Sequence, residues 1–338
     1  MDMRIFLDLL SGGRGRAVCL GLIGVALVGS NDAQAFPPAT DAGTSSQIIA
    51  VTPQIDMVRM AIQERLAPRG RRSSIALAPG VRGMAAGEEK GGYSGWAGYS
   101  GGEAELQGPE VRSSIDVSSI SLGYDLAWSK TVTAGVSLSL ERSRMRYWFS
   151  LPGARGEGHV VSLAPYVGWS IAPGLTADLI LGFARGENDH VMDPDTRVFA
   201  GSQGVRRQIL AASLNQQWQR GSIEWAVRGG VLGTRQRNQA YLLGPSAVDA
   251  SDSDTTRLQL GLQATHVGGS FLPYAGITHA YDLARPSDGS LGRSGTMLSL
   301  GALWTPHRAL TASLSYQREV GRSGSDNDLF MLNLMARF

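Results

Sequence analysis

The chain ends in a stretch that alternates apolar and mixed side chains, and this pattern constrains the fold more than any other feature. Over residues 328–338 every second residue is apolar: Phe330, Leu332, Leu334, Ala336 and Phe338. A period of two places successive side chains on opposite faces of a β-strand. The sequence therefore predicts a terminal strand with one apolar face and an aromatic residue as its last.

The same alternation recurs from about Gly91 onward, in twelve segments by our count. One segment places Ile120, Leu122 and Tyr124 on one face and small or polar residues on the other. The connections alternate between two lengths. The tight turns are Ser129-Lys130, Ala172–Gly174, Gln219–Gly221, Val267–Ser270 and Pro306–Arg308. The longer connections cover roughly residues 100–116, 149–157, 185–204, 236–254 and 282–294, with a shorter one at 321–327.

This strict alternation predicts a transmembrane barrel, because outer-membrane barrels have short periplasmic turns and longer extracellular loops. Ten residues rise about 3.3 Å each, so at a tilt of about 40° they span roughly 25 Å, the height of the lipid-facing band. After the first 35 residues no apolar run is long enough for a helical span of about 20 residues. We expect a twelve-stranded antiparallel transmembrane β-barrel, an all-β fold over residues 89–338.

Tryptophans gather beside the tight turns. The residues concerned are Trp128, Trp169, Trp218, Trp225 and Trp304. Aromatic side chains concentrate at membrane interfaces, because an apolar ring there still allows an indole N–H to reach water. We interpret the five as a girdle on the periplasmic side, and the alternative is that they are core residues of a soluble barrel.

The amino-terminal residues 1–35 have the layout of a secretory signal peptide. Arginines precede the apolar run Ala17–Val28, and Ala33-Gln34-Ala35 provides an A-x-A cleavage site. The single cysteine, Cys19, lies within this leader. A mature chain without cysteine suits the bacterial envelope better than a disulfide-rich secreted module. A formal net charge of +2 gives no reason to expect a nucleic-acid partner.

Residues 36–88 form an extension that contains a predicted helix over about 52–66. Thr52 suits its N-cap and Pro53 its first turn. The residues that we assign to a lumen helix are Ile55, Val58, Arg59, Ile62, Arg65 and Leu66. A helix of about fourteen residues spans about 21 Å, close to the barrel's own height. The residues alone leave two readings open, a helix threaded through the lumen or one packed outside it.

In this order along the chain, the features resemble the translocator β-barrel domain of type V autotransporters. A Gly-rich first strand (Gly95–Gly98), the stretch Leu122–Asp125, Tyr166, Asp178 and the ending Ala336-Arg337-Phe338 carry the resemblance. It implies a Gram-negative outer-membrane barrel with a helix in its pore that passes an N-terminal passenger to the cell surface. The partners that it implies are the lipid bilayer and lipopolysaccharide, periplasmic chaperones and the barrel-assembly machinery, which reads the terminal strand.

The resemblance also sets expectations about the passenger and the oligomeric state. Only about 15 residues lie between the expected cleavage site and the helix, so we expect a minimal N-terminal segment threaded through or plugging the pore. We expect a monomer. The linker helix holds no asparagine for self-cleavage.

Two other functions were weighed. A stand-alone narrow pore is the first. The second is a loop-based hydrolase, for which Asp189 and His190 in the connection after the fifth strand are the candidates, since an Asp–His pair can activate a water. A solvated acidic loop explains the same residues, and no G-x-S-x-G, P-loop or dinucleotide glycine pattern appears in a strand-to-helix context. We expect no enzyme, no cofactor and no metal site.

Overall fold

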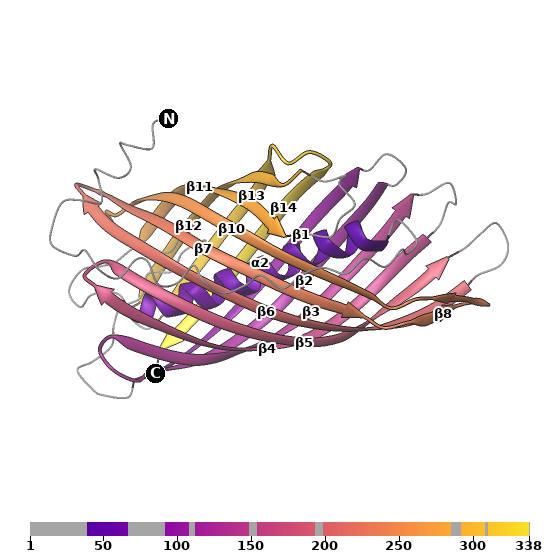
Figure 1. Ribbon diagram of the computed structural model, residues 1–338. Coiled ribbons are helices and arrows are strands. Elements are labelled where there is room, and N and C mark those ends of the chain that lie inside the picture. Colours follow the sequence, from indigo (N-terminus) through magenta and orange to yellow (C-terminus); the bar gives the residue numbers. More distant parts are fainter. Residues whose placement is uncertain are drawn as a thin grey trace. The chain divides into compact units, whose positions relative to one another are not determined.

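The computed structural model describes residues 39–66, 92–107, 112–148, 154–192, 199–284, 292–307 and 310–337. The expected signal peptide and residues 67–91 lie outside this part. Within it, twelve antiparallel strands close into a barrel, and the helix α2 (Ala39–Leu66) accompanies them (Figure 1). The predicted twelve-stranded antiparallel barrel is confirmed.

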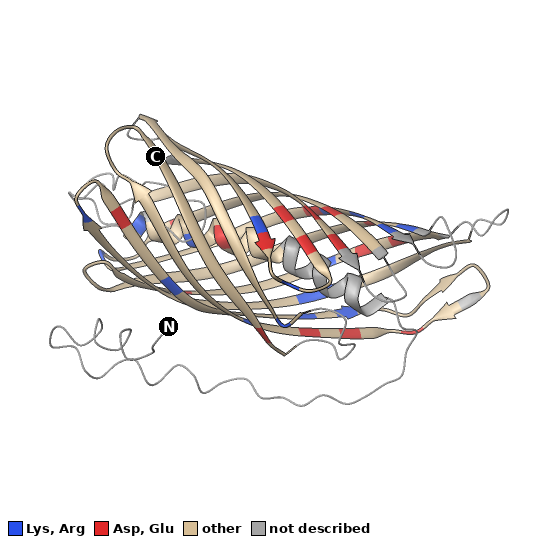
Figure 2. Cartoon of the chain, turned by 90° about the horizontal axis from the view of Figure 1, so that it is seen from above, with Lys and Arg blue, Asp and Glu red and all other residues tan. Residues whose placement is uncertain are grey.

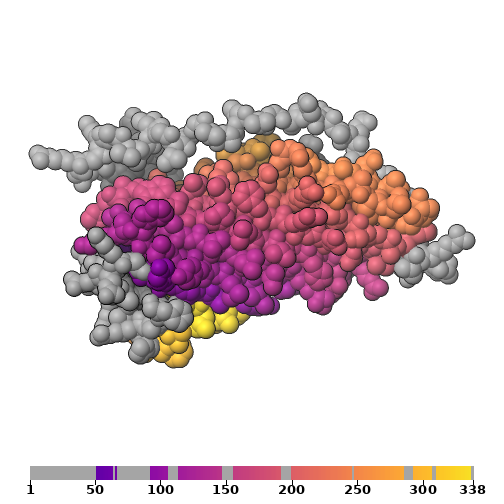
Figure 3. Space-filling view, turned by 90° about the horizontal axis from the view of Figure 1, so that it is seen from below, coloured from indigo at the N-terminus to yellow at the C-terminus, as the bar shows by residue number. Residues whose placement is uncertain are grey.

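The barrel strands follow one another around the wall in chain order. They are β1 (Tyr93–Gln107), β2 (Arg112–Ala127), β3 (Val132–Trp148), β4 (Ala154–Ala172), β5 (Leu175–Met192), β6 (Phe199–Arg220), β7 (Ile223–Asn238), β10 (Ser251–His266), β11 (Phe271–Ala284), β12 (Ser294–His307), β13 (Leu310–Val320) and β14 (Ser325–Arg337). The last strand, β14, pairs with β1 from Ser94↔Arg337 to Leu106↔Ser325 and so closes the wall. Figure 3 shows the first strands beside the yellow carboxyl-terminal ones on one face of the molecule.

The short connections gather at one end of the barrel, as the sequence predicts. β4 and β5 are separated only by Pro173 and Gly174, and β6 and β7 only by Gly221 and Ser222. Gly174 has φ 76° and Gly221 has φ 62°. Tight two-residue turns need a positive φ at one or both central positions, and glycine adopts such values without a steric cost; Pro173 followed by Gly174 is typical of a type II turn.

At the other end the structure corrects the predicted boundaries. The strands are longer than ten residues, since β6 has 22 and β5 has 18. The connection expected over 100–116 therefore shrinks to residues 108–111. Polar segments without apolar alternation continue the ladder here, because backbone hydrogen bonds do not require lipid-facing side chains. A small hairpin of β8 (Tyr241–Leu243) and β9 (Ser246–Val248), which was not predicted, lies between β7 and β10.

Apolar side chains lie on both sides of the wall, and the outer set is the larger. Outward-facing residues such as Ile120, Leu122 and Leu300 are 53%, 53% and 62% exposed. An apolar surface that surrounds a whole barrel exceeds the patches that soluble monomers expose, and it suits contact with lipid. Among the described residues no helix has the length and apolar character of a membrane span.

The helix α2 is longer than predicted. It begins at Ala39 instead of Thr52, and Pro53 lies within it instead of in its first turn. Proline in a helix interior removes one backbone hydrogen bond and costs about 3 kcal/mol. The sequence rule favours a start at this proline for that reason. The rule fails here because Val51 and Thr52, which precede Pro53, are buried as well, at 0% and 9% exposed, and this packing offsets part of the local cost.

Candidate functional site

Every side chain of α2 from Val51 to Gln63 is buried. A helix that packs on one surface keeps a polar side in solvent, so burial all round means that the helix is enclosed. α2 contacts β1 to β5 and also β10 and β14, which lie on different sides of the wall. The helix therefore lies in the lumen, as Figure 1 shows along the length of the barrel.

Charged residues of the helix meet charged residues of the wall on β5 and β7. The Arg59 Nε donates a hydrogen bond to the Asp178 carboxylate on β5 at 3.3 Å. The Arg228 guanidinium on β7 donates to the Asp56 carboxylate of the helix, also at 3.3 Å. All four side chains are at most 4% exposed. Ser213 on β6 donates to Asp178 as well.

A second polar cluster lies near the end of the helix. Arg65 donates to the Asp125 carboxylate on β2 and to the Gly92 carbonyl oxygen, the latter at 2.7 Å. Asp125 also accepts from Ser94 Oγ at 2.7 Å and from the Tyr166 hydroxyl at 3.4 Å. Because Asp125 and Gly92 lie at the end of the barrel with short turns, the carboxyl end of α2 lies at that end too. The helix therefore runs from the long-connection end toward the short-turn end.

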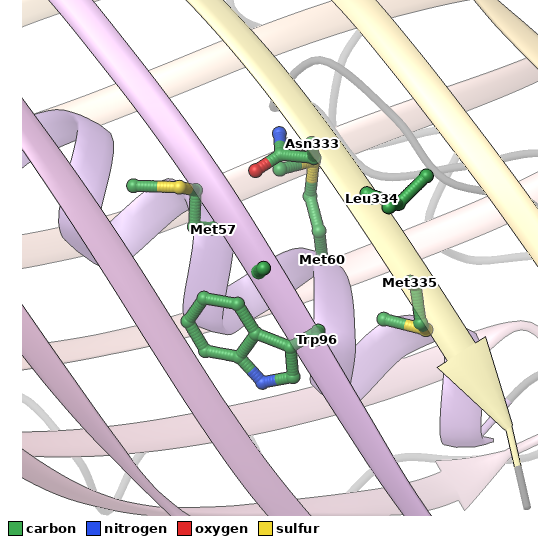
Figure 4. A pocket seen from close by; sticks show the side chains of 7 residues that line it. Met57, Met60, Trp96, Asn333, Leu334 and Met335 are labelled. Atoms are coloured by element: carbon green, nitrogen blue, oxygen red, sulfur yellow. Dashed lines mark hydrogen bonds between the residues drawn. The ribbon is translucent and has the colours of Figure 1, made fainter.

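Glycines on the wall allow the helix to approach closely. A Cβ built on Gly168 of β4 would overlap Ile62 Cγ2, and one on Gly98 of β1 would overlap Met57 Sδ. Beneath the seam of β1 and β14, Met57 and Met60 face Trp96 around a cavity of about 10 Å³ (Figure 4). This volume holds at most one water molecule. The helix and the wall are therefore in close contact at this place.

The structure places the residues predicted for the lumen helix as follows. Ile55, Val58, Arg59, Ile62 and Leu66 are between 1% and 6% exposed, and Arg65 is partly buried against Asp125. They lie on one side of the helix, and residues on its other sides are buried too, since Met57, Met60 and Gln63 are 1%, 2% and 7% exposed.

The other predicted residues lie on the outer face of the wall. Trp128, Trp218 and Trp304 are 77%, 44% and 52% exposed, and Trp169 and Trp225 are half-buried. Trp225 lies opposite Trp218 in the β6–β7 ladder, beside a short turn. Phe330, Leu332 and Leu334 are 42%, 46% and 49% exposed. The side chain of Ala336, and Phe338 as a whole, lie outside the described part.

Asp189 and His190, the hydrolase candidates, belong to β5 and not to a loop. As neighbours on a strand they point to opposite faces of the wall. Asp189 is exposed, whereas the His190 ring stacks on Tyr241 of β8 with centroids 5.2 Å apart. The strand therefore does not bring the two side chains together.

Sequence reasoning found the arginines of the helix but missed their partners. Asp125 and Asp178 were noted only as parts of the resemblance, and Asp56 and Arg228 had no role. One signal was present in the sequence. Asp125 and Asp178 are the single Asp, Glu, Lys or Arg in the inward sets of their strands, where serine, glycine and alanine are frequent, and Arg228 shares the inward set of β7 with one other charge, Glu224. A lone charge facing a lumen needs a partner, because an unpaired buried charge is costly.

Comparisons with known proteins found similarity to autotransporter barrels. The family model described as autotransporter beta-domain matches residues 95–321. Among solved structures, the translocator domain of the autotransporter NalP from Neisseria meningitidis is 14% identical, and the match covers 87% of this chain and 100% of that chain with a TM-score of 0.67. A search of curated proteins found no match.

Two further solved structures are similar. The β domain of the Bordetella autotransporter Brka is 16% identical, and the match covers 73% of this chain and 100% of that chain with a TM-score of 0.61. The transport unit of the autotransporter AIDA-I from Escherichia coli is 14% identical, with coverage of 72% and 90% and a TM-score of 0.58. At these identities the likeness is one of fold.

Proposed function

Because the chain belongs to the autotransporter beta-domain family, whose translocator domains lie in Gram-negative outer membranes, we propose that its barrel carries its own N-terminal segment to the cell surface. In this proposal α2 then stays in the lumen as a plug. The direction of the helix supports the proposal. Its carboxyl end lies at the short-turn end, which is periplasmic in such barrels, so its amino end is directed toward the long-connection end.

The proposal that α2 is a plug rests on the charge pairs between the helix and the wall. Arg59, Arg65 and Asp56 of the helix meet Asp178, Asp125 and Arg228 of the wall. Removing one partner of a buried ion pair costs about 3–5 kcal/mol, because the other charge stays behind without compensation. A helix held by three such pairs does not leave the lumen readily, and it closes the path for ions.

Conductance in planar bilayers tests the plug. Deletion of residues 39–66 opens a twelve-stranded lumen, so we expect a large rise in single-channel conductance over the wild type. A matched control replaces Arg318, which lies on the outer face of β13 and is half-exposed, with glutamine and leaves the conductance unchanged. Equal conductance of the deletion and the wild type would refute the plug. High conductance of the wild type would favour the alternative, a stand-alone narrow pore.

Export and display need their own tests. We propose that residues 1–35 are a signal peptide, so the mature chain begins at Phe36, and the mass of the protein isolated from outer membranes tests this start. A protease-sensitive tag placed after Ala35 tests display. Cleavage of that tag on intact cells is expected. A tag that remains protected until the outer membrane is opened argues against translocation.

We propose further that the chain is not an enzyme. The opposite orientations of Asp189 and His190 on β5 support this, because a dyad needs both side chains on one side of the wall. Any hydrolytic activity of the purified protein should therefore survive Asp189→Asn and His190→Gln. An activity that both variants abolish would revive the hydrolase alternative.

The apolar outer face of the last strand supports a proposal about the partners in assembly. We propose that the barrel-assembly machinery, supplied by periplasmic chaperones, recognises β14 through Phe330, Leu332, Leu334, Ala336 and Phe338. We propose that the barrel is a monomer without a nucleic-acid partner, and light scattering in detergent tests the monomer.

A further inference from the structure

Three arginines form a row across neighbouring strands on the outer face of the wall. Arg185 of β5 lies directly opposite Arg206 of β6, and Arg206 lies directly opposite Arg237 of β7. All three side chains are exposed. Directly opposite side chains on one face of a ladder have Cβ atoms about 4.5–5.5 Å apart, and like charges at that separation destabilise the pair. The row therefore needs an explanation.

The protein itself supplies little compensation for this charge. Arg237 forms an ion pair with Asp252 at 3.3 Å. Across the described residues, neither Arg185 nor Arg206 has an ion pair or a side-chain hydrogen bond. Nearby arginines differ in this respect, since Arg142 donates to Glu157 at 2.9 Å. Arg185 and Arg206 are thus two adjacent positive charges without a carboxylate partner among the described residues.

The row lies where the outer face changes from apolar to charged. On β5 the outward residues before Arg185 are Leu181 and Phe183, which are 41% and 56% exposed. On β6 the exposed Leu210 lies toward the short-turn end from Arg206. Beyond the row toward the long connections, the outward residue Glu187 is charged. The row therefore lies at headgroup level on the long-connection side, which is the outer leaflet.

The opposite side of the barrel carries another charge pattern at this boundary. Outward positions of β14 and β1 hold Asp326, Asp328 and Glu103, and Arg318 of β13 lies 3.9 Å from Asp328. Figure 2 shows that charged residues are more frequent in the half of the barrel that carries β8 and β9. The described strands on that opposite side thus carry carboxylates at the level where β5–β7 carry a row of three arginines, so the charge around the barrel is not uniform.

We propose that Arg185, Arg206 and Arg237 bind a phosphate group of lipopolysaccharide in the outer leaflet. A phosphate monoester presents oxygens to several N–H donors at once, and a guanidinium matches that geometry with two parallel hydrogen bonds. The acyl chains of the same molecule then lie along Leu181, Phe183 and Leu210. This site is on the outer face, so it does not depend on the lumen helix or on the proposed translocation.

The test uses the full chain purified from outer membranes into detergent and titrated with lipid A that carries its phosphates. The variant Arg185→Gln/Arg206→Gln removes two of the three cations, and the matched control is Arg318→Gln on the far side of the barrel. An arginine near an anionic surface contributes roughly fivefold in affinity, so the double variant should bind roughly thirtyfold more weakly. The control should bind as the wild type does. Dephosphorylated lipid A should bind wild type and double variant equally.

Thermal unfolding provides a second readout that does not depend on measured affinity. In detergent without lipid A, Arg206→Gln should unfold at the same temperature as the wild type or a higher one, because it relieves like-charge repulsion. With lipid A the wild type should gain more stability than the variant. Equal lipid A affinity of wild type and double variant overturns the proposal. The proposal is also overturned if the wild type binds dephosphorylated lipid A as tightly as phosphorylated lipid A, or if Arg318→Gln loses as much affinity as the double variant.

Discussion

Replacement of Arg59 with methionine removes the cation that joins α2 to Asp178 of the wall. Its Nε lies 3.3 Å from Asp178 Oδ1, and the two side chains are 1% and 2% exposed. Removing one partner of a pair buried to this extent costs about 3–5 kcal/mol. Ser213 still donates to Asp178, and Asp56 keeps Arg228. We therefore expect the low end of the range, about 3 kcal/mol.

Urea unfolding in lipid vesicles measures this cost, and a double-mutant cycle isolates the pair. Arg59→Met and Asp178→Asn should each destabilise the barrel, and together they should cost about 2 kcal/mol less than the sum of the single changes. An exposed pair offers the control. Arg318→Met breaks the contact with Asp328, and both of these side chains are about half-exposed. The substitution should therefore lower the free energy of unfolding by less than about 1 kcal/mol. If Arg59→Met is as mild as Arg318→Met, the helix is not held by this pair.

Three more predictions concern packing, position in the membrane and assembly. Gly168→Val drives its side chain into Ile62 and should destabilise the barrel by about 1–3 kcal/mol, whereas Ile62→Ala in the same chain should restore part of the loss in urea unfolding. Lipids brominated near the headgroup should quench the fluorescence of Trp128, which is 77% exposed, but not that of the buried Trp96. Variants that retain only one of the two tryptophans measure this, and equal quenching of both would contradict the assignment of the two faces. Phe330→Asp should slow folding into membranes that contain the assembly machinery, followed by heat-modifiable gel mobility, and an unchanged rate would refute recognition of β14.

The wall of the barrel was predictable because lipid on one side and a lumen on the other impose the same rule on every strand. Residues such as Ile120 and Leu122 alternate with small polar neighbours, and glycines such as Gly174 and Gly221 mark the hairpins. Only local chemistry was needed to locate these features. The extensions of the strands toward the long connections carry no such alternation, so their ends were misplaced.

The interior of the barrel was less predictable because it depends on how two elements fit together. Pro53 satisfies the rules for a helix start, so nothing nearby indicated that α2 begins at Ala39. Which carboxylate faces Arg59 depends on the depth and rotation of the helix and on the register of β5. These are properties of the assembled molecule. A lone inward charge such as Asp178 signals that a partner exists, but it does not identify that partner.

A designed disulfide tests most directly whether α2 lies in the lumen of the barrel in the membrane. A Cβ at Gly168 lies 3.2 Å from the Ile62 Cβ, near the separation of about 3.5–4.5 Å that disulfides have. With Cys19 replaced by alanine, Ile62→Cys/Gly168→Cys should cross-link on mild oxidation in outer membranes and shift in mobility on gels. The control Ile62→Cys/Val167→Cys places its second thiol on the opposite face of β4 and should not cross-link. Failure of the first pair to cross-link, in a barrel shown to be folded, would contradict the account.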